Sequence, residues 1–177
     1  MPVRFTPPPP LPSEVLARTV RLASIDGRMV LWLSGTFALF AAMGHEVVGA
    51  VAGCAAAGAG AMELHGVTVV RAGESRGLDW MIRAQLLLLA TILLYAATRL
   101  MTWNPELITE RITPDIEDRI AQFQMTREQF LEATKTLYQL VYAVVGFVGL
   151  IYQGGMARYY MRRRAIIRQA LDEHEPA

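Results

Sequence analysis

The longest apolar stretch of the chain runs from Met29 to Met62 and is interrupted only by His45 and Glu46. As one helix it would be about 51 Å long, since each helical residue adds about 1.5 Å. The hydrocarbon core of a bilayer is only about 30 Å thick. One long helix remains an alternative, but the length favours two membrane spans joined by a tight turn at Gly44–Glu46. These two spans are predicted at residues 29–43 and 47–70.

Two further apolar segments, residues 81–103 and 137–160, are long enough to cross a bilayer. Hydrophobic residues make up 53% of the chain and charged residues 19%, which is more apolar than a typical water-soluble domain. A single cysteine excludes a disulfide-stapled module, and the many apolar side chains exclude a disordered chain. The sequence therefore predicts an all-α integral membrane protein folded as a four-helix bundle, with the lipid bilayer as a partner.

The basic residues are unevenly distributed between the two predicted sides of the membrane. With four spans, twelve of the 17 Lys and Arg residues lie on the side that holds both termini, which the positive-inside rule places in the cytoplasm. Three spans would put the two arginine-rich ends on opposite sides and break the rule. With no organelle signal visible, we expect a bacterial inner (plasma) membrane protein. Aromatic residues agree with this topology. Four are expected near the inner interface: Trp32, Trp80, Tyr159 and Tyr160. Trp103 is expected near the outer interface.

Two polar segments flank the predicted membrane domain, residues 29–160. Residues 1–28 begin with a proline-rich tail. From Ser13, a predicted N-cap, an amphipathic stretch fits a short helix on the membrane surface or, equally, a solvated lead-in to the first span. Residues 161–177 form a basic cytoplasmic tail. Its arginines and one at the end of the last span are predicted to anchor the chain and contact lipid headgroups: Arg158, Arg162, Arg163, Arg164 and Arg168.

The segment between the third and fourth spans, residues 104–136, carries seven acidic residues against four basic ones. Thr113, Pro114 and Asp115 form a typical helix start, since proline suits the first turn and an acid suits the positive end of the helix dipole. Residues 126–129 match a capping box that opens another helix. We expect an acidic, amphipathic helical segment that rests on the outer face of the bundle.

Small residues recur at every fourth position of the second predicted span. Such a stripe lets another helix approach closely. We interpret it first as packing within one bundle and second as the face of a homodimer. Two glycines of the fourth span are candidates for the facing groove. The residues assigned to helix packing are Gly49, Gly53, Ala57, Ala61, Gly146 and Gly149.

The most informative polar residue is Glu63, in the inner part of the second span. A charged group at membrane depth is costly, so it usually faces protein or water and has a partner. Residues two apart on a helix diverge by about 200°, so Glu63 and His65 are not expected to point into one pocket. Matching depths along the antiparallel spans predicts an intramembrane polar cluster of Glu63, His65, Gln85, Tyr152 and Gln153.

This cluster has two interpretations: a structural clasp that fixes helix packing, or a proton-carrying or substrate-binding carboxyl of a small ion-coupled transporter. A metal site would need three or four converging ligands, so we predict neither metal nor cofactor. Cys54 lies among alanines and is read as an apolar filler. No catalytic motif is recognisable, and a net charge of +1 gives no reason to expect nucleic acid binding.

The sequence thus predicts an architecture more clearly than an activity. The favoured function is a non-catalytic accessory, scaffold or sensor subunit that contacts another membrane protein or a second copy of itself. The alternative is a small oligomeric transporter or channel built around the intramembrane Glu63, and an enzyme ranks third.

Overall fold

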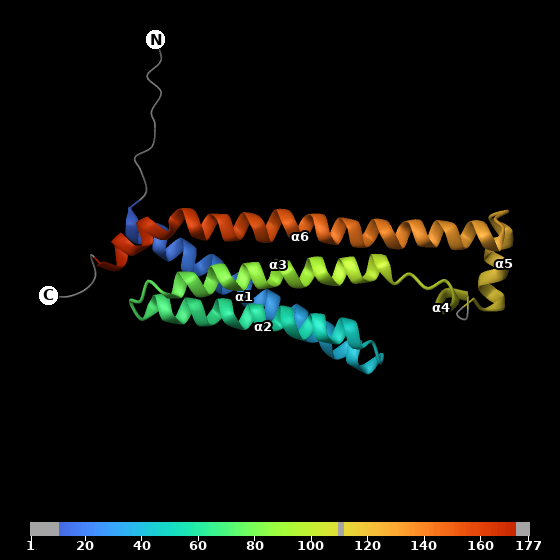
Figure 1. The fold of residues 1–177 in the computed structure, drawn as a ribbon, viewed down its shortest axis with the longest axis horizontal. Coiled ribbons are helices and arrows are strands. Elements are labelled where there is room, and N and C mark those ends of the chain that lie inside the picture. Colours follow the sequence, from blue (N-terminus) through green and yellow to red (C-terminus); the bar gives the residue numbers. More distant parts are fainter. Residues whose placement is uncertain (1–10, 110–111, 173–177) are drawn as a thin grey trace, which may run out of the picture.

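Four long helices make up most of the protein, and no strand occurs in the part of the chain that the structure describes. The computed structural model describes residues 11–109 and 112–172. The long helices pack in antiparallel order into a bundle, which confirms the predicted all-α fold class (Figure 1). They are α1 (Pro12–Met43), α2 (Val47–Arg71), α3 (Gly77–Met101) and α6 (Arg127–Asp172), with two short helices, α4 (Glu106–Thr109) and α5 (Pro114–Gln122), between the last two.

All four long helices are long and apolar enough to cross a membrane. The chain is therefore a multi-pass membrane protein. Pro12 and Asp172, the outermost helical residues of α1 and α6, lie at one end of the bundle, which we call the terminal end (Figure 1). The turn Gly44–Glu46 lies toward the opposite, distal end.

Helix α1 runs unbroken from Pro12 to Met43, so the segment before residue 29 is not a separate surface helix. It is the lead-in to the first span, but it is packed within the bundle rather than solvated, since Val15, Thr19 and Ala23 are buried. The predicted N-cap at Ser13 is wrong. Proline itself opens the helix, because its missing N–H is one that the first turn would leave unpaired.

The apolar stretch from Met29 to Met62 is broken at Gly44–Glu46, as the span lengths predicted. His45 adopts a left-handed backbone conformation with φ 57°, and the amide of Glu46 donates to the carbonyl of Ala41 at 2.8 Å. The Glu46 carboxylate lies 2.6 Å from the guanidinium of Arg99 near the end of α3. An ion pair therefore connects the turn to a neighbouring helix.

Helix α6 has 46 residues and is about 69 Å long, far more than a bilayer needs. The predicted fourth span, residues 137–160, is its middle part, and residues 161–172 of the predicted basic tail continue the same helix. The capping box is confirmed. The Gln129 amide donates to Thr126 Oγ1 at 3.2 Å, and the Thr126 amide donates to Gln129 Oε1 at 2.9 Å.

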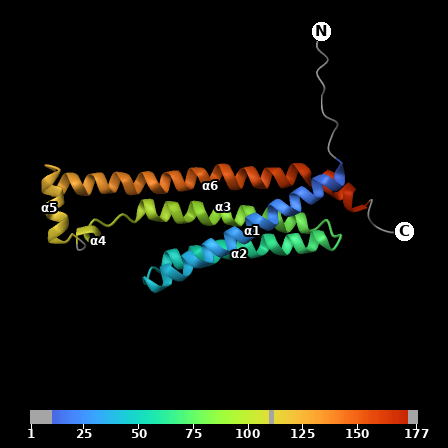
Figure 2. The same ribbon diagram turned by 180° about the vertical axis from the view of Figure 1, so that it is seen from behind.

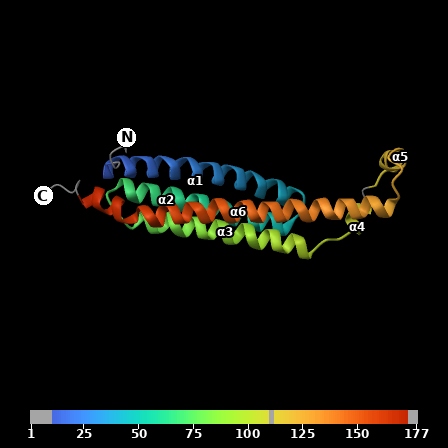
Figure 3. The same ribbon diagram turned by 90° about the horizontal axis from the view of Figure 1, so that it is seen from above.

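At the distal end, α6 projects beyond α1, α2 and α3 in each view (Figures 1, 2 and 3). Helix α5 begins at Pro114 as predicted and lies across the projecting end of α6. It does not rest on the outer face of the bundle as expected, because the segment after Met101 carries the chain outward along α6. We call α4, α5 and the first ten residues of α6 the distal arm.

The apolar core is concentrated at the terminal end. A large cluster there joins all four long helices and includes Tyr160, Leu78, Met81 and Ile167. A smaller cluster around Ala56, Ala59 and Leu88 lies further toward the distal end. Beyond it the hairpin of α1 and α2 diverges from α6 (Figure 1). The bundle is thus tight where the termini meet and opens toward the distal end.

Candidate functional site

One polar residue from each long helix is buried at the same level of the bundle. Asp26 of α1 is 8% exposed, Glu63 of α2 1%, Gln85 of α3 1% and Gln153 of α6 6%. We call these four residues the polar layer. On α2 the layer is flanked by members of both apolar clusters and lies about 12 Å along the helix from Arg71. It is therefore a polar plane within an apolar core.

Hydrogen bonds connect the layer across the helices. Gln85 Nε2 donates to Asp26 Oδ2 at 3.0 Å, and the Tyr152 hydroxyl donates to Asp26 Oδ1 at 2.9 Å. The Tyr160 hydroxyl donates to Glu63 Oε1 at 2.6 Å. The Glu63 side chain also lies next to those of Asp26 and Gln85. The two carboxyl groups therefore form one network with donors from α3 and α6.

The network has more acceptors than donors. Neither carboxyl forms an ion pair with a cationic side chain among the described residues. Two buried amide oxygens, Gln85 Oε1 and Gln153 Oε1, have no hydrogen-bond partner in the same part of the chain. Buried acceptors without donors are costly. The arrangement is suited to holding a shared proton, a water molecule or a small cation.

The structure brings together Glu63, Gln85, Tyr152 and Gln153, four of the five residues of the predicted cluster. His65 lies outside it. Its ring is exposed and packs edge-on against Trp80, with ring centroids 5.1 Å apart. The 200° divergence expected between Glu63 and His65 accounts for this difference.

Two members of the network, Asp26 and Tyr160, do not belong to the cluster predicted from the sequence. Asp26 was assigned to a polar segment outside the membrane domain, because the first long uncharged run starts at Met29. Thr19, Ala23 and Asp26 follow one another at spacings of four and three, so they share one face of a helix. This spacing places Asp26 on the core-facing side of one continuous helix. Tyr160 was expected at the membrane interface, but it is completely buried.

The buried stripe of α2 differs from the predicted one. Gly49 and Gly53 are buried, whereas Ala57 is half-buried and Ala61 is exposed. A strict four-residue spacing turns by about 40° per step around a helix, so it leaves the contact face after two steps. The buried face instead alternates steps of four and three: Gly49, Gly53, Ala56, Gly60, Glu63, Val67 and Val70.

The glycines of α2 make close contact with α1. A Cβ at Gly53 would lie 2.8 Å from the backbone of Ala38, and one at Gly60 would lie 2.7 Å from the amide nitrogen of Leu31. The expectation that Gly146 and Gly149 of α6 form the facing groove is wrong. Both face α3, where a Cβ at Gly149 would lie 2.8 Å from the Ile92 side chain.

The arginines predicted to contact lipid headgroups have different surroundings. Arg164 pairs with Asp79 at the start of α3, with a nitrogen–oxygen distance of 2.7 Å. Arg163 lies over the Tyr159 ring at 5.7 Å. The remaining three are exposed: Arg158, Arg162 and Arg168.

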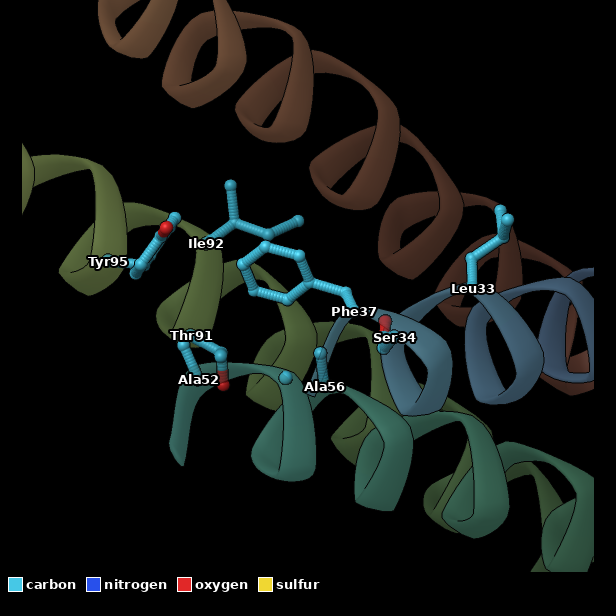
Figure 4. A pocket seen from close by; sticks show the side chains of 9 residues that line it. Leu33, Ser34, Phe37, Ala52, Ala56, Thr91, Ile92 and Tyr95 are labelled. Atoms are coloured by element: carbon cyan, nitrogen blue, oxygen red, sulfur yellow. The ribbon is translucent and has the colours of Figure 1, made fainter. Parts of the chain in front are cut away.

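A cavity of about 280 Å³ lies where the α1–α2 hairpin diverges, and Phe37 of α1 points across it toward Ile92 and Tyr95 of α3 (Figure 4). Tyr95 also begins a row of aromatic contacts that continues to Tyr142 and Tyr138 of α6 and ends at Trp103. The cavity lining is mostly apolar: Leu33, Ser34, Phe37, Ala52, Gly53, Ala56, Thr91, Ile92 and Tyr95. Its size and lining suit an apolar group.

A groove of about 420 Å³ runs between α3 and α6 and reaches Tyr152 and Gln153.

No family model, curated protein or solved structure matches the chain. Function is therefore inferred from the polar layer, the distal arm and the surface of the bundle.

Proposed function

We propose that this multi-pass membrane protein is a non-catalytic accessory, scaffold or sensor subunit that contacts another membrane protein or a second copy of itself. The observation that carries this proposal is the distal arm. It stands beyond the ends of the other three spans and is held at the end of one long helix (Figure 1).

The distal arm has the properties of a contact surface. Its sequence segment is acidic, and α5 packs against α6 on one side only. Ile120 of α5 is buried, whereas Phe123, directly after the helix, is 75% exposed. Large exposed aromatic residues beside charged ones are typical of protein interfaces.

The membrane-facing surface also leaves room for partners. Within the most apolar 18-residue stretch of each long helix, between 17% and 33% of the residues are buried inside the bundle. The rest is available to lipid or to another helix. A four-helix unit of this kind fits a role as a subunit that packs beside other membrane helices.

The proposed orientation places the terminal end in the cytoplasm of a bacterial inner membrane and the distal arm outside. The positive-inside rule supports it, because eleven of the 15 basic residues that the structure describes lie in segments that belong to the terminal end. An acidic arm on the outer side agrees with the same rule.

The test is the native mass of the protein after gentle extraction, with identification of whatever co-purifies in fixed ratio. We expect a stoichiometric complex, and we expect deletion of residues 114–122 to release the partner while the four long helices stay folded. As a matched control, Leu150→Ala, on the lipid-facing side of α6, should leave the complex intact. A monomer without any partner, or a complex that survives loss of α5, would contradict the proposal.

The second candidate, a small oligomeric transporter or channel, is favoured by one observation. Asp26 and Glu63 are in contact within the bundle, without a cationic partner in the described chain. Two adjoining carboxyls in a low-dielectric interior are stabilised when they share a proton. A proton or cation held there could be exchanged along the groove that reaches Tyr152 and Gln153.

Separate variants distinguish the two functions. If the layer moves ions, Glu63→Gln and Asp26→Asn should abolish proton or sodium flux into vesicles while the protein remains folded and assembled. If the layer is a clasp, the same variants should lower the unfolding temperature, and wild-type vesicles should show no flux above empty ones. Loss of folding in both variants together with absence of wild-type flux would exclude the transporter.

A further inference from the structure

A pocket of about 460 Å³ lies on the surface of the terminal end, between α1 and the end of α2. It belongs neither to the polar layer nor to the distal arm. Three arginines surround it, together with small and aliphatic residues. Its lining residues are Ala17, Val20, Arg21, Ser24, Ile25, Arg28 and Arg71.

Within the part of the chain that the structure describes, no acidic side chain pairs with the three arginines. Arg21, Arg28 and Arg71 are exposed, and they take part in no ion pair or hydrogen bond between side chains of the described residues. Asp26, the acid nearest in sequence to Arg28, is buried and bound to Gln85 on the core side of α1. Glu74, the acid nearest in sequence to Arg71, pairs with Arg76. Three like charges around one pocket favour an anion.

Arg21, Ile25, Arg28 and Trp32 follow one another at spacings of four, three and four, so they share one face of α1. The two arginines are separated by about 10 Å along the helix axis. Trp32 lies toward the membrane-spanning part and is 75% exposed, and Ile25 is exposed between the arginines. The face therefore changes from cationic at the terminal end to apolar along the span.

We propose that this pocket binds the phosphate headgroup of an anionic phospholipid, with the acyl chains lying along the exposed face of α1. Guanidinium groups bind phosphate oxygens through paired, charge-assisted hydrogen bonds. Basic pockets between membrane helices at the cytoplasmic surface suit such headgroups. The exposed Met29 and Trp32 beside the pocket favour a lipid over a soluble phosphate, because a soluble anion would leave that apolar surface unused.

This site is distinct from the arginines of α6 that the sequence predicted to contact lipid headgroups. Those residues lie on another helix, and Arg164 among them is bound to Asp79. The pocket instead combines two arginines from α1 with the last residue of α2, so it exists only where these helices are packed together.

The test uses the full chain in a mild detergent and measures bound phosphatidylglycerol by native mass spectrometry, with phosphatidylcholine as the neutral comparison. We expect wild-type protein to retain phosphatidylglycerol selectively. The triple variant Arg21→Gln, Arg28→Gln, Arg71→Gln should weaken this binding by about a hundredfold, as loss of three charges near a lipid surface predicts. The control Arg18→Gln, Arg83→Gln, Arg127→Gln removes the same charge from exposed positions outside the pocket. It should weaken binding less than about threefold, because none of these arginines lines the pocket and exposed charge pairs contribute little.

Three results would overturn the proposal. The first is equal retention of phosphatidylglycerol and phosphatidylcholine by the wild-type protein. The second is an equal loss of binding in the pocket variant and the control, which would show general charge attraction. The third is displacement of the lipid by millimolar glycerol phosphate, which would show a site for a soluble phosphate. If the triple variant fails to fold, Arg28→Gln alone against Arg18→Gln provides the same comparison.

Discussion

The hydrogen bond from Tyr160 to Glu63 joins two completely or almost completely buried side chains from α6 and α2. Burying a carboxyl is costly unless its oxygens find donors. Removing this bond would therefore destabilise the protein mainly because it would leave a buried carboxyl oxygen of Glu63 without a donor. It also fixes the rotation of α6 about its axis, because only one face of the helix presents Tyr160 and Gln153 to the core.

We expect Tyr160→Phe to lower the free energy of unfolding by about 1–3 kcal/mol, since the ring still fills its space but Glu63 loses a donor. Reversible unfolding in mixed micelles measures this change. The matched control is Tyr159→Phe, whose hydroxyl contacts Thr19 Oγ1 at 3.2 Å in a half-buried position. Its loss should be about 0.5 kcal/mol or less. Equal losses in the two variants would show that Glu63 finds another donor.

At the scale of the helices, the most extensive contact is between α1 and α2. Steps of four and three along α2 bring small residues against α1 on one side of the helix only. This is the spacing of left-handed helix pairs, in which the contact face repeats every 3.5 residues. Gly53 lies on that face, whereas Gly58 has no atom within 4 Å of the position its Cβ would take.

Gly53→Ala should therefore destabilise the protein by about 1–3 kcal/mol, because the added methyl group meets the backbone of Ala38. Gly58→Ala, five residues away, should be neutral or stabilise the helix by up to about 1 kcal/mol. Thermal unfolding of both variants in the same detergent gives the comparison. If Gly53→Ala unfolds at the wild-type temperature, then α1 and α2 are not in close contact at this position.

The positions of the helices could be predicted from the sequence more fully than their contacts. Span lengths placed the turn at Gly44–Glu46, and local capping residues placed the starts of α5 and α6. Asp26 could not be recognised by hydropathy, because a charged residue ends an apolar window even when its neighbours on the same face are buried. The pairing of Gly149 with Ile92 depends on which helices are adjacent, and that is set by the whole bundle.

At the scale of the whole molecule, the four spans define two sides, and α5 marks one of them. Single cysteines at Ser75 and Asp118, introduced into a Cys54→Ser background, test this arrangement. Ser75 lies in the turn between α2 and α3 at the terminal end, and Asp118 is exposed on α5. In intact cells an impermeant thiol reagent should label position 118 and leave position 75 unlabelled.

Breaking the cells should make position 75 reactive, which shows that its thiol is accessible and was shielded by the membrane. Labelling of both positions in intact cells would contradict the four-span topology. Labelling of position 75 alone would reverse the orientation and place the distal arm in the cytoplasm.

The length of α6 has a mechanical consequence. One unbroken helix carries the distal arm at its start, contributes Tyr152 and Tyr160 to the hydrogen-bond network in its second half, and ends at Asp172 beyond it. A stiff rod of this kind transmits rotation and tilt along its length. The same helix therefore connects the position of α5 mechanically to the tyrosines that bond to Asp26 and Glu63.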